Sequence, residues 1–195
     1  GTYGVGTCQT SNTCATCLAG YYCPIGSATY SACSAGSYST AGSSSCTSCP
    51  PGKYSSSSAS SSCSNCAGGY YGSSYGNTSS TCDGCCEAGF YCPAGSTSSR
   101  QNRCPSGKYS DPYSDSSTDC LTCPSGTFYI DSLNPLGAVL YGECYNGLNL
   151  CITCPEGSYC TGGTRYSCPS GKYNPNTGST SSTACATCPA NSYCT

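Results

Sequence analysis

Cysteine is the residue type with which this sequence could do chemistry. The chain holds 24 cysteines among 195 residues, and it has no histidine. Many of the cysteines stand in CxxC pairs, a spacing that suits a zinc site, a redox-active dithiol or a disulfide framework. The pairs are Cys14/Cys17, Cys46/Cys49, Cys63/Cys66, Cys82/Cys85, Cys120/Cys123, Cys151/Cys154 and Cys185/Cys188.

Disulfides are the best of these three interpretations. The run Cys46-x2-Cys49-x13-Cys63-x2-Cys66 is close to a zinc-ribbon spacing. Against zinc stand the absence of histidine and a composition typical of secreted proteins. A redox CxxC needs an α/β fold around it, which this chain cannot make. A cysteine content above roughly 8–10 percent is typical of a disulfide scaffold in an oxidising compartment. We therefore expect no metal and no cofactor.

The cysteines also begin ten copies of a short unit. Each copy has a start cysteine, glycine at position four and an aromatic residue at position six. The tenth copy has Asn191 in place of glycine, the residue that best tolerates a left-handed backbone. The start cysteines are Cys17, Cys33, Cys49, Cys66, Cys86, Cys104, Cys123, Cys154, Cys168 and Cys188. A pattern repeated this often indicates a structural repeat, because an enzyme needs its site only once.

The unit has a physical interpretation. Proline, present at position two in six copies, fixes φ there, and glycine allows the positive φ with which the chain reverses. We expect the aromatic ring to lie back over the cystine and to be buried there. After position six, a copy closes in one of two ways. A short closure has cysteine at position seven, and a long closure has a Ser/Thr/Gly-rich arc that runs to the next cysteine.

Proximity predicts the disulfides of the short closures. These pairs are Cys17–Cys23, Cys86–Cys92, Cys154–Cys160 and Cys188–Cys194, with Cys8–Cys14 before the first copy. The arcs are low in complexity, as in the serine run from Ser55 to Ser58, so they cannot pack a core. We expect them to be solvent-facing turns and short strands.

The combination Cys-Pro-x-Gly-x-Tyr, an arc, then Cys-x-x-Cys-Pro-x-Gly resembles the ephrin-receptor-like cysteine-rich repeats. It is also similar to the first loop module of tumour necrosis factor receptor ectodomains. The resemblance covers residues 14–194. In the receptor family the cysteine before proline pairs with the one that ends the arc. The resemblance therefore implies the pairs Cys33–Cys46, Cys49–Cys63, Cys104–Cys120 and Cys168–Cys185.

The pattern departs from that scheme in two places. Cys82, Cys85 and Cys86 crowd three thiols together, and we predict Cys66–Cys82 there. Cys123 faces both Cys144 and Cys151; we predict Cys123–Cys144, and Cys151 is the open alternative. One cysteine near 82–85 and one of Cys144/Cys151 then remain. They pair with each other or join neighbouring subunits.

These patterns predict a small disulfide-rich fold. We expect an elongated solenoid or rod of tandem cysteine-rich repeats with short β-hairpins and almost no helix. The expected segments are an N-terminal lead over 1–13, repeats over 14–123, an apolar inserted segment over 124–153 and repeats over 154–195.

The apolar inserted segment holds most of the chain's Leu, Ile and Val residues. One interpretation is a local mini-core beneath a long loop, and a second is a patch that docks a partner or the next copy of the chain. A small-ligand pocket is a third. The predicted interface residues are Ile130, Leu133, Leu136, Val139, Leu140, Tyr141, Leu148 and Leu150.

Other chemistry is poorly supported. There is no histidine base and the carboxylates are scattered, so we expect no enzyme. Asp111, Asp115 and Asp119 lie in one arc, where solvated turn-forming roles are favoured over a weak calcium site. The net charge of −2 gives no basic face for nucleic acid. No run of about 18 apolar residues occurs, so no membrane span is expected within this segment.

Asn77-Thr78-Ser79 is an N-glycosylation sequon within an arc, and we predict a glycan on Asn77. We expect a secretory signal peptide on the precursor and an extracellular or cell-surface location. The predicted function is structural: a self-assembling subunit of an extracellular filament, appendage or cell coat, whose partners are copies of itself and covalent glycans. The alternative is a receptor or adhesion ectodomain fragment that binds a protein ligand.

Overall fold

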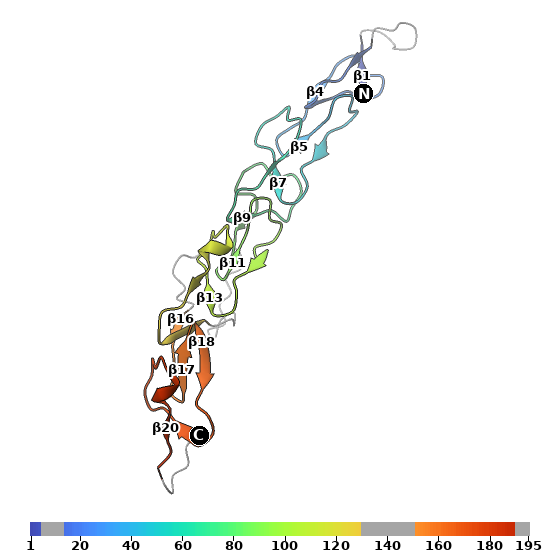
Figure 1. The fold of residues 1–195 in the computed structure, drawn as a ribbon. Helices are drawn as coiled ribbons and strands as arrows, with labels where there is room; N and C mark the ends of the chain where they lie inside the picture. Colours follow the sequence, from blue (N-terminus) through green and yellow to red (C-terminus); the bar gives the residue numbers. More distant parts are fainter. Residues whose placement is uncertain (5–13, 130–150, 190–195) are drawn as a thin grey trace. The chain divides into compact units, whose positions relative to one another are not determined.

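The computed structural model describes residues 1–4, 14–129 and 151–189, and these form a small disulfide-rich, mostly β structure. The chain divides into two compact units. The first comprises Gly1–Cys86 with Cys92–Gln101, and the second comprises Glu87–Tyr91 with Asn102–Thr195. Within the first unit the hairpins follow one another in chain order (Figure 1).

Short antiparallel hairpins are the regular structure of both units. In the first unit they are β1 (Thr2–Tyr3) with β2 (Ala15–Thr16), β3 (Tyr21–Tyr22) with β4 (Ser31–Ala32), β5 (Ser37–Tyr38) with β6 (Thr47–Ser48), β7 (Lys53–Tyr54) with β8 (Ser64–Asn65), and β9 (Tyr70–Tyr71) with β10 (Gly84–Cys85). In the second they are β11 (Phe90–Tyr91) with β12 (Asn102–Arg103), β13 (Lys108–Tyr109) with β14 (Leu121–Thr122), β15 (Thr127–Tyr129) with β16 (Cys151–Thr153), β17 (Ser158–Thr161) with β18 (Thr164–Ser167), and β19 (Lys172–Tyr173) with β20 (Ala186–Thr187).

The repeat explains where each hairpin forms. In the third copy, a β-turn closed by the Lys53 N–H on the Pro50 carbonyl leads into β7. Its third residue is Gly52, whose φ of +78° is the value that a type II turn requires. The aromatic Tyr54 suits an extended strand and pairs with Ser64. The partner strand β8 consists of the two residues between Cys63 and Cys66. The two residues between the cysteines of this CxxC pair therefore form the second strand of the hairpin.

Helical structure in the described part of the chain is limited to two 3₁₀ turns. The first, η1, spans Ser117–Asp119, and the second, η2, spans Ser182–Ala184. At η1 the Ser116 side chain and the Asp119 carboxylate cap each other's backbone N–H groups, which forms a capping box. The expectation of almost no helix agrees with these short turns.

The core consists of half-cystines. The side chains of Cys17, Cys33, Cys49, Cys66, Cys86, Cys92, Cys154 and Cys160 are fully buried. The described aromatic residues at position six, by contrast, are half-buried, so the expectation that they would be buried is met only in part.

Nine disulfides join described residues. As predicted, the structure contains the pairs Cys17–Cys23, Cys33–Cys46, Cys49–Cys63, Cys66–Cys82, Cys86–Cys92, Cys104–Cys120, Cys154–Cys160 and Cys168–Cys185, and the ninth pair is Cys123–Cys151. Cys14, Cys85 and Cys188 are also disulfide-bonded. The predicted pairs Cys8–Cys14 and Cys188–Cys194 each involve a residue outside the described ranges.

The predicted pair Cys123–Cys144 is wrong, because Cys123 is bonded to Cys151. Cys151 stands three residues before the next start cysteine, as Cys46 and Cys63 do in the earlier long closures. The hairpin of β15 and β16 brings Cys151 next to Cys123, with 5.6 Å between their Cα atoms. In this long closure, as in the others, the start cysteine pairs with the cysteine three residues before the next start cysteine. The loop that it closes has a sequence separation of 28.

Candidate functional site

The feature that recurs along the chain is the junction between successive repeats. At the junction of the third and fourth copies, the Gly52 N–H donates to the Gly72 carbonyl at 2.7 Å. The Ser55 N–H donates to the Asn77 carbonyl at 3.0 Å, and the Gly76 N–H donates to the Cys49 carbonyl at 2.8 Å. All three bonds join backbone atoms, so the junction does not depend on particular side chains.

Each of these three bonds has equivalents at other junctions within the two units. The position-four N–H donates to the position-seven carbonyl of the next copy in Gly20–Ser39, Gly36–Ser55, Gly69–Cys92, Gly89–Ser110 and Gly157–Asn174. The position-seven N–H donates to an arc carbonyl of the next copy in Cys23–Ser43, Ser39–Ser60, Gly72–Ser96, Tyr129–Gly163 and Cys160–Ser179. An arc N–H donates back to the preceding start cysteine in Gly42–Cys17, Ala59–Cys33, Gly95–Cys66 and Gly178–Cys154.

A repeat also touches the copy after the next one. The arc residue that donates to the start cysteine has a positive φ, and we call it the arc turn residue. Its carbonyl points at a position-four glycine two copies back: a Cβ on Gly52 would lie 2.3 Å from the Gly95 oxygen. We call this contact a glycine seat. Similar approaches, at 2.1–2.5 Å, join Gly20 to Ala59, Gly36 to Gly76, Gly107 to Gly162 and Gly126 to Gly178.

Position seven carries buried polar side chains that sequence reasoning missed. The Ser110 side chain is fully buried, and its hydroxyl donates to the Phe90 carbonyl of the preceding copy at 2.8 Å. Ser39 makes the same bond to Tyr21 at 2.8 Å, and the Asn174 amide reaches Ser158 at 2.7 Å. The sequence contained an indication of this role, because a small or polar residue (Ser, Gly, Asn or Cys) follows the aromatic residue in nearly every copy.

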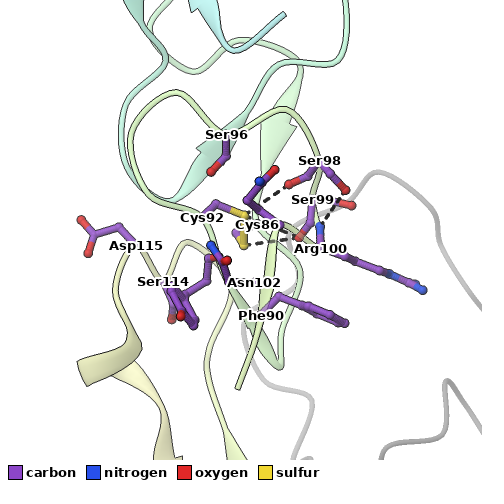
Figure 2. The surroundings of a disulfide bond; sticks show 12 residues. Cys86, Phe90, Cys92, Ser96, Ser98, Ser99, Arg100, Asn102, Ser114 and Asp115 are labelled. Atoms are coloured by element: carbon purple, nitrogen blue, oxygen red, sulfur yellow. Dashed lines mark hydrogen bonds between the residues drawn. A yellow bond between two sulfur atoms is a disulfide. The ribbon is translucent and has the colours of Figure 1, made fainter. Parts of the chain in front are cut away.

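The Cys86–Cys92 cystine lies against the backbone of the segment that follows it. In Figure 2 the Cys86–Cys92 disulfide lies beside Ser98 and Ser99, with the Cys86 sulfur 3.3 Å from the Ser99 carbonyl oxygen. A cystine sulfur has no hydrogen to donate, so this is a packing contact. Both side chains are fully buried, which keeps the bridge away from thiols in solution.

The zinc-ribbon spacing does not produce free thiolates. Cys46, Cys49, Cys63 and Cys66 are all in disulfides, with Cys33 and Cys82 as the outer partners. Over residues 1–4, 14–129 and 151–189, no group of three or more His, Cys, Asp or Glu side chains gathers as a metal ion would require. The carboxylate of Asp119 instead accepts from the N–H groups of Asp115 and Ser116 at 3.0 and 3.1 Å.

The N-terminal residues behave as part of a repeat. The Cys17 N–H donates to the Gly1 carbonyl at 3.1 Å, as the Cys33 N–H does to Gly20. Thr2 pairs with Thr16 and Tyr3 with Ala15, so Gly1 stands at position four and Tyr3 at position six. The sequence signal was Gly1-Thr2-Tyr3 itself, which matches the Gly-x-aromatic portion of the unit.

One carboxylate is held by an anion-binding loop. Asp83 Oδ2 accepts from the Ser73 N–H at 2.6 Å, from the Ser73 hydroxyl at 2.9 Å and from the Ser74 N–H at 2.8 Å. Partial burial raises the pKa of Asp83, but the hydrogen bonds from Ser73 and Ser74 outweigh it and hold the pKa below its usual value.

A lowered pKa makes the carboxylate's contribution to stability pH-dependent. Folding favours the charged form of Asp83, so its contribution is full above the unfolded pKa of about 3.9 and falls as the pH drops through the lower folded value. We expect Asp83→Asn to flatten the acid limb of the unfolding profile below about pH 4. Urea midpoints measured from pH 2 to 7 test this. Asp111→Asn serves as the control, and identical acid limbs in the two variants would contradict the assignment.

A cavity of about 450 Å³ lies within the second unit. Its walls include Arg103, Gly107, Tyr129, Thr164 and Arg165. The Arg165 guanidinium donates from Nε to the Ser158 hydroxyl at 2.9 Å and lies 5.9 Å from the centre of the Phe128 ring. These contacts hold Arg165 against the hairpin of β17 and β18.

The predicted interface residues, from Ile130 to Leu150, lie outside the described residues, so the joint stays a prediction. Asn77 lies in the first unit and is half-buried. Its backbone takes part in a junction, and its Nδ2 donates to the Ser74 carbonyl at 3.2 Å.

No protein-family model and no curated protein matches the chain. Among the described residues, no helix is long and apolar enough to cross a membrane.

Proposed function

We propose that this chain is a structural, self-assembling subunit of an extracellular filament, appendage or cell coat. The observation that carries the proposal is the junction between repeats, which is built from the same backbone atoms wherever it occurs in the described part of the chain. Because the same backbone hydrogen bonds form at each junction, a second chain could continue the stack of repeats through these bonds and would need no further binding surface. Contacts of this head-to-tail kind generate open fibres.

The backbone hydrogen bonds of the junctions, which we call the junction ladder, and the glycine seats also support a solenoid. In a solenoid each copy contacts its neighbours in sequence. The proposal extends the family resemblance to cysteine-rich extracellular repeats. It assigns the chain no enzymatic activity. An extracellular location fits the buried cystines, because such bridges persist in oxidising compartments.

A glycan on Asn77 belongs to the same proposal. Attachment to Nδ2 leaves that nitrogen one hydrogen, which can keep the bond to Ser74. We expect the glycosidase that cleaves the Asn–sugar bond to lower the mass of native material and to convert Asn77 to aspartate. Peptide mass spectrometry locates the change, with Asn65, which has no sequon, as the internal control. An unmodified Asn77 peptide would contradict the prediction.

Electron microscopy of unreduced native material tests the proposed function. We expect regular fibres in which this chain is the repeating subunit. Separate particles at every concentration would instead favour the alternative, a receptor or adhesion ectodomain fragment. Immunolabelling with antibodies to the exposed segment around Leu121 identifies the chain in the fibres.

A further inference from the structure

An exposed tyrosine stands two residues before the sequon in the arc of the fourth repeat, in the order Tyr75-Gly76-Asn77-Thr78-Ser79. The position-six aromatic residue of this copy is Tyr71, so the repeat itself does not require Tyr75. Tyr75 is 72 % exposed, the highest value among the described tyrosines. A single exposed aromatic residue is ordinary on a protein surface, so its meaning depends on where the backbone holds it.

The backbone on both sides of this tyrosine is fixed by hydrogen bonds. Before it, the N–H groups of Ser73 and Ser74 donate to the Asp83 carboxylate, at 2.6 and 2.8 Å. After it, the Gly76 N–H donates to the Cys49 carbonyl at 2.8 Å, and the carbonyl of the same glycine occupies a glycine seat. The exposed ring therefore projects from a turn that is already ordered.

Asn77 is held in the same turn, close to that ring. The Ser55 N–H donates to the Asn77 carbonyl at 3.0 Å. Asn77 Nδ2 donates to the Ser74 carbonyl at 3.2 Å, and this carbonyl belongs to the peptide that leads into Tyr75. Nδ2 also faces Gly72, where an added Cβ would lie 3.0 Å away. A sugar is too large for that space, so a sugar on Nδ2 extends to the solvent side of the turn, where the ring is exposed.

We propose that the Tyr75 ring is the platform on which the first sugar of the Asn77 glycan stacks. That sugar is an N-acetylglucosamine, and its pyranose ring presents C–H groups of slight positive charge. The face of a tyrosine ring is electronegative, so the two faces attract each other. Because the turn is already ordered, little of this attraction is lost to ordering the chain. The inference rests on the glycan in the proposed function and names the residue that positions it.

A thermodynamic cycle on the secreted full chain measures the contact. An endoglycosidase that leaves a single N-acetylglucosamine trims the glycan, and Ser79→Ala gives the sugar-free form with Asn77 in place. Each form is prepared with tyrosine and with leucine at position 75, so that the effect of Ser79→Ala itself cancels. We expect the sugar to raise the urea midpoint when Tyr75 is present and most of that rise to disappear in Tyr75→Leu. Tyr75→Phe, which keeps an aromatic face, should retain the rise.

Proton chemical shifts of the sugar report on the same contact independently of stability. An aromatic ring stacked on the pyranose moves its C–H resonances upfield. The native glycoprotein should show this shift, Tyr75→Phe should keep it and Tyr75→Leu should abolish it. Tyr166→Leu is the matched control, because Tyr166 is also exposed but lies in the second unit, and it should leave the sugar resonances unchanged.

Two results would overturn the inference and leave the Asn77 glycan and the proposed filament subunit standing. One is a set of sugar resonances in the native chain that match those of free N-acetylglucosamine. The other is an equal midpoint change on glycosylation with tyrosine and with leucine at position 75. An Asn77 that carries no sugar would overturn the inference and the predicted glycan together.

Discussion

Replacing Gly52 with alanine should destabilise the first unit by about 2–5 kcal/mol, whereas Gly171→Ala should cost only about 1–2 kcal/mol. Both glycines have a φ of +78°, so an alanine meets the same backbone strain at either position. At Gly52 the added Cβ also collides with the Gly95 carbonyl oxygen, at 2.3 Å, whereas at Gly171 it meets no described atom within 4 Å. The difference between the variants therefore measures the steric requirement of an occupied glycine seat.

Urea unfolding of the disulfide-intact variants gives the two free energies. Hydrogen exchange at the Gly72 and Gly76 amides reports separately on the junction beside Gly52. Equal losses of stability in the two variants would show that positive φ alone explains glycine at position four. A larger loss at Gly52, with faster exchange at both amides, is the expected result.

Full reduction should unfold both units. The largest fully buried side chains are mostly half-cystines, and the hairpins contribute few other buried groups. A disulfide that closes a loop of about 15 residues contributes roughly 3 kcal/mol, whereas ordering costs about 1.5 kcal/mol for each residue. The rest of the stabilising free energy comes from the turn hydrogen bonds and from the hydrogen bonds between repeats. These bonds form only while the cystines hold the hairpins together.

Amide chemical shifts before and after reduction with a phosphine, followed by alkylation, test this expectation. The alkylated chain without reduction is the control. We expect the dispersed amide resonances to collapse into the range of an unfolded chain. Native-like dispersion after complete alkylation would mean that the ladder is stable without its covalent bridges.

The pairs of the short closures, such as Cys17–Cys23, were predicted from proximity, because few residues separate the two cysteines. The pair Cys49–Cys63 and the other long closures were predicted from the family resemblance. The turn at Gly52 was predicted from local sequence, because glycine at position four allows a positive φ. Cys123 was the exception, because its arc offers two cysteines and the sequence distance to each is long.

The contacts between repeats could be identified only in the tertiary structure. That Gly52 accommodates the Gly95 carbonyl, from two copies further along, depends on how hairpins stack and not on any local pattern. The burial of Ser110 and the partial exposure of Tyr109 have the same origin, since burial is set by neighbouring copies. The sequence by itself thus determined the repeat, its turns and the short closures, because cysteine spacing and turn residues act locally. Packing between copies decided which position-four glycines face a carbonyl group of a later copy, as Gly52 does.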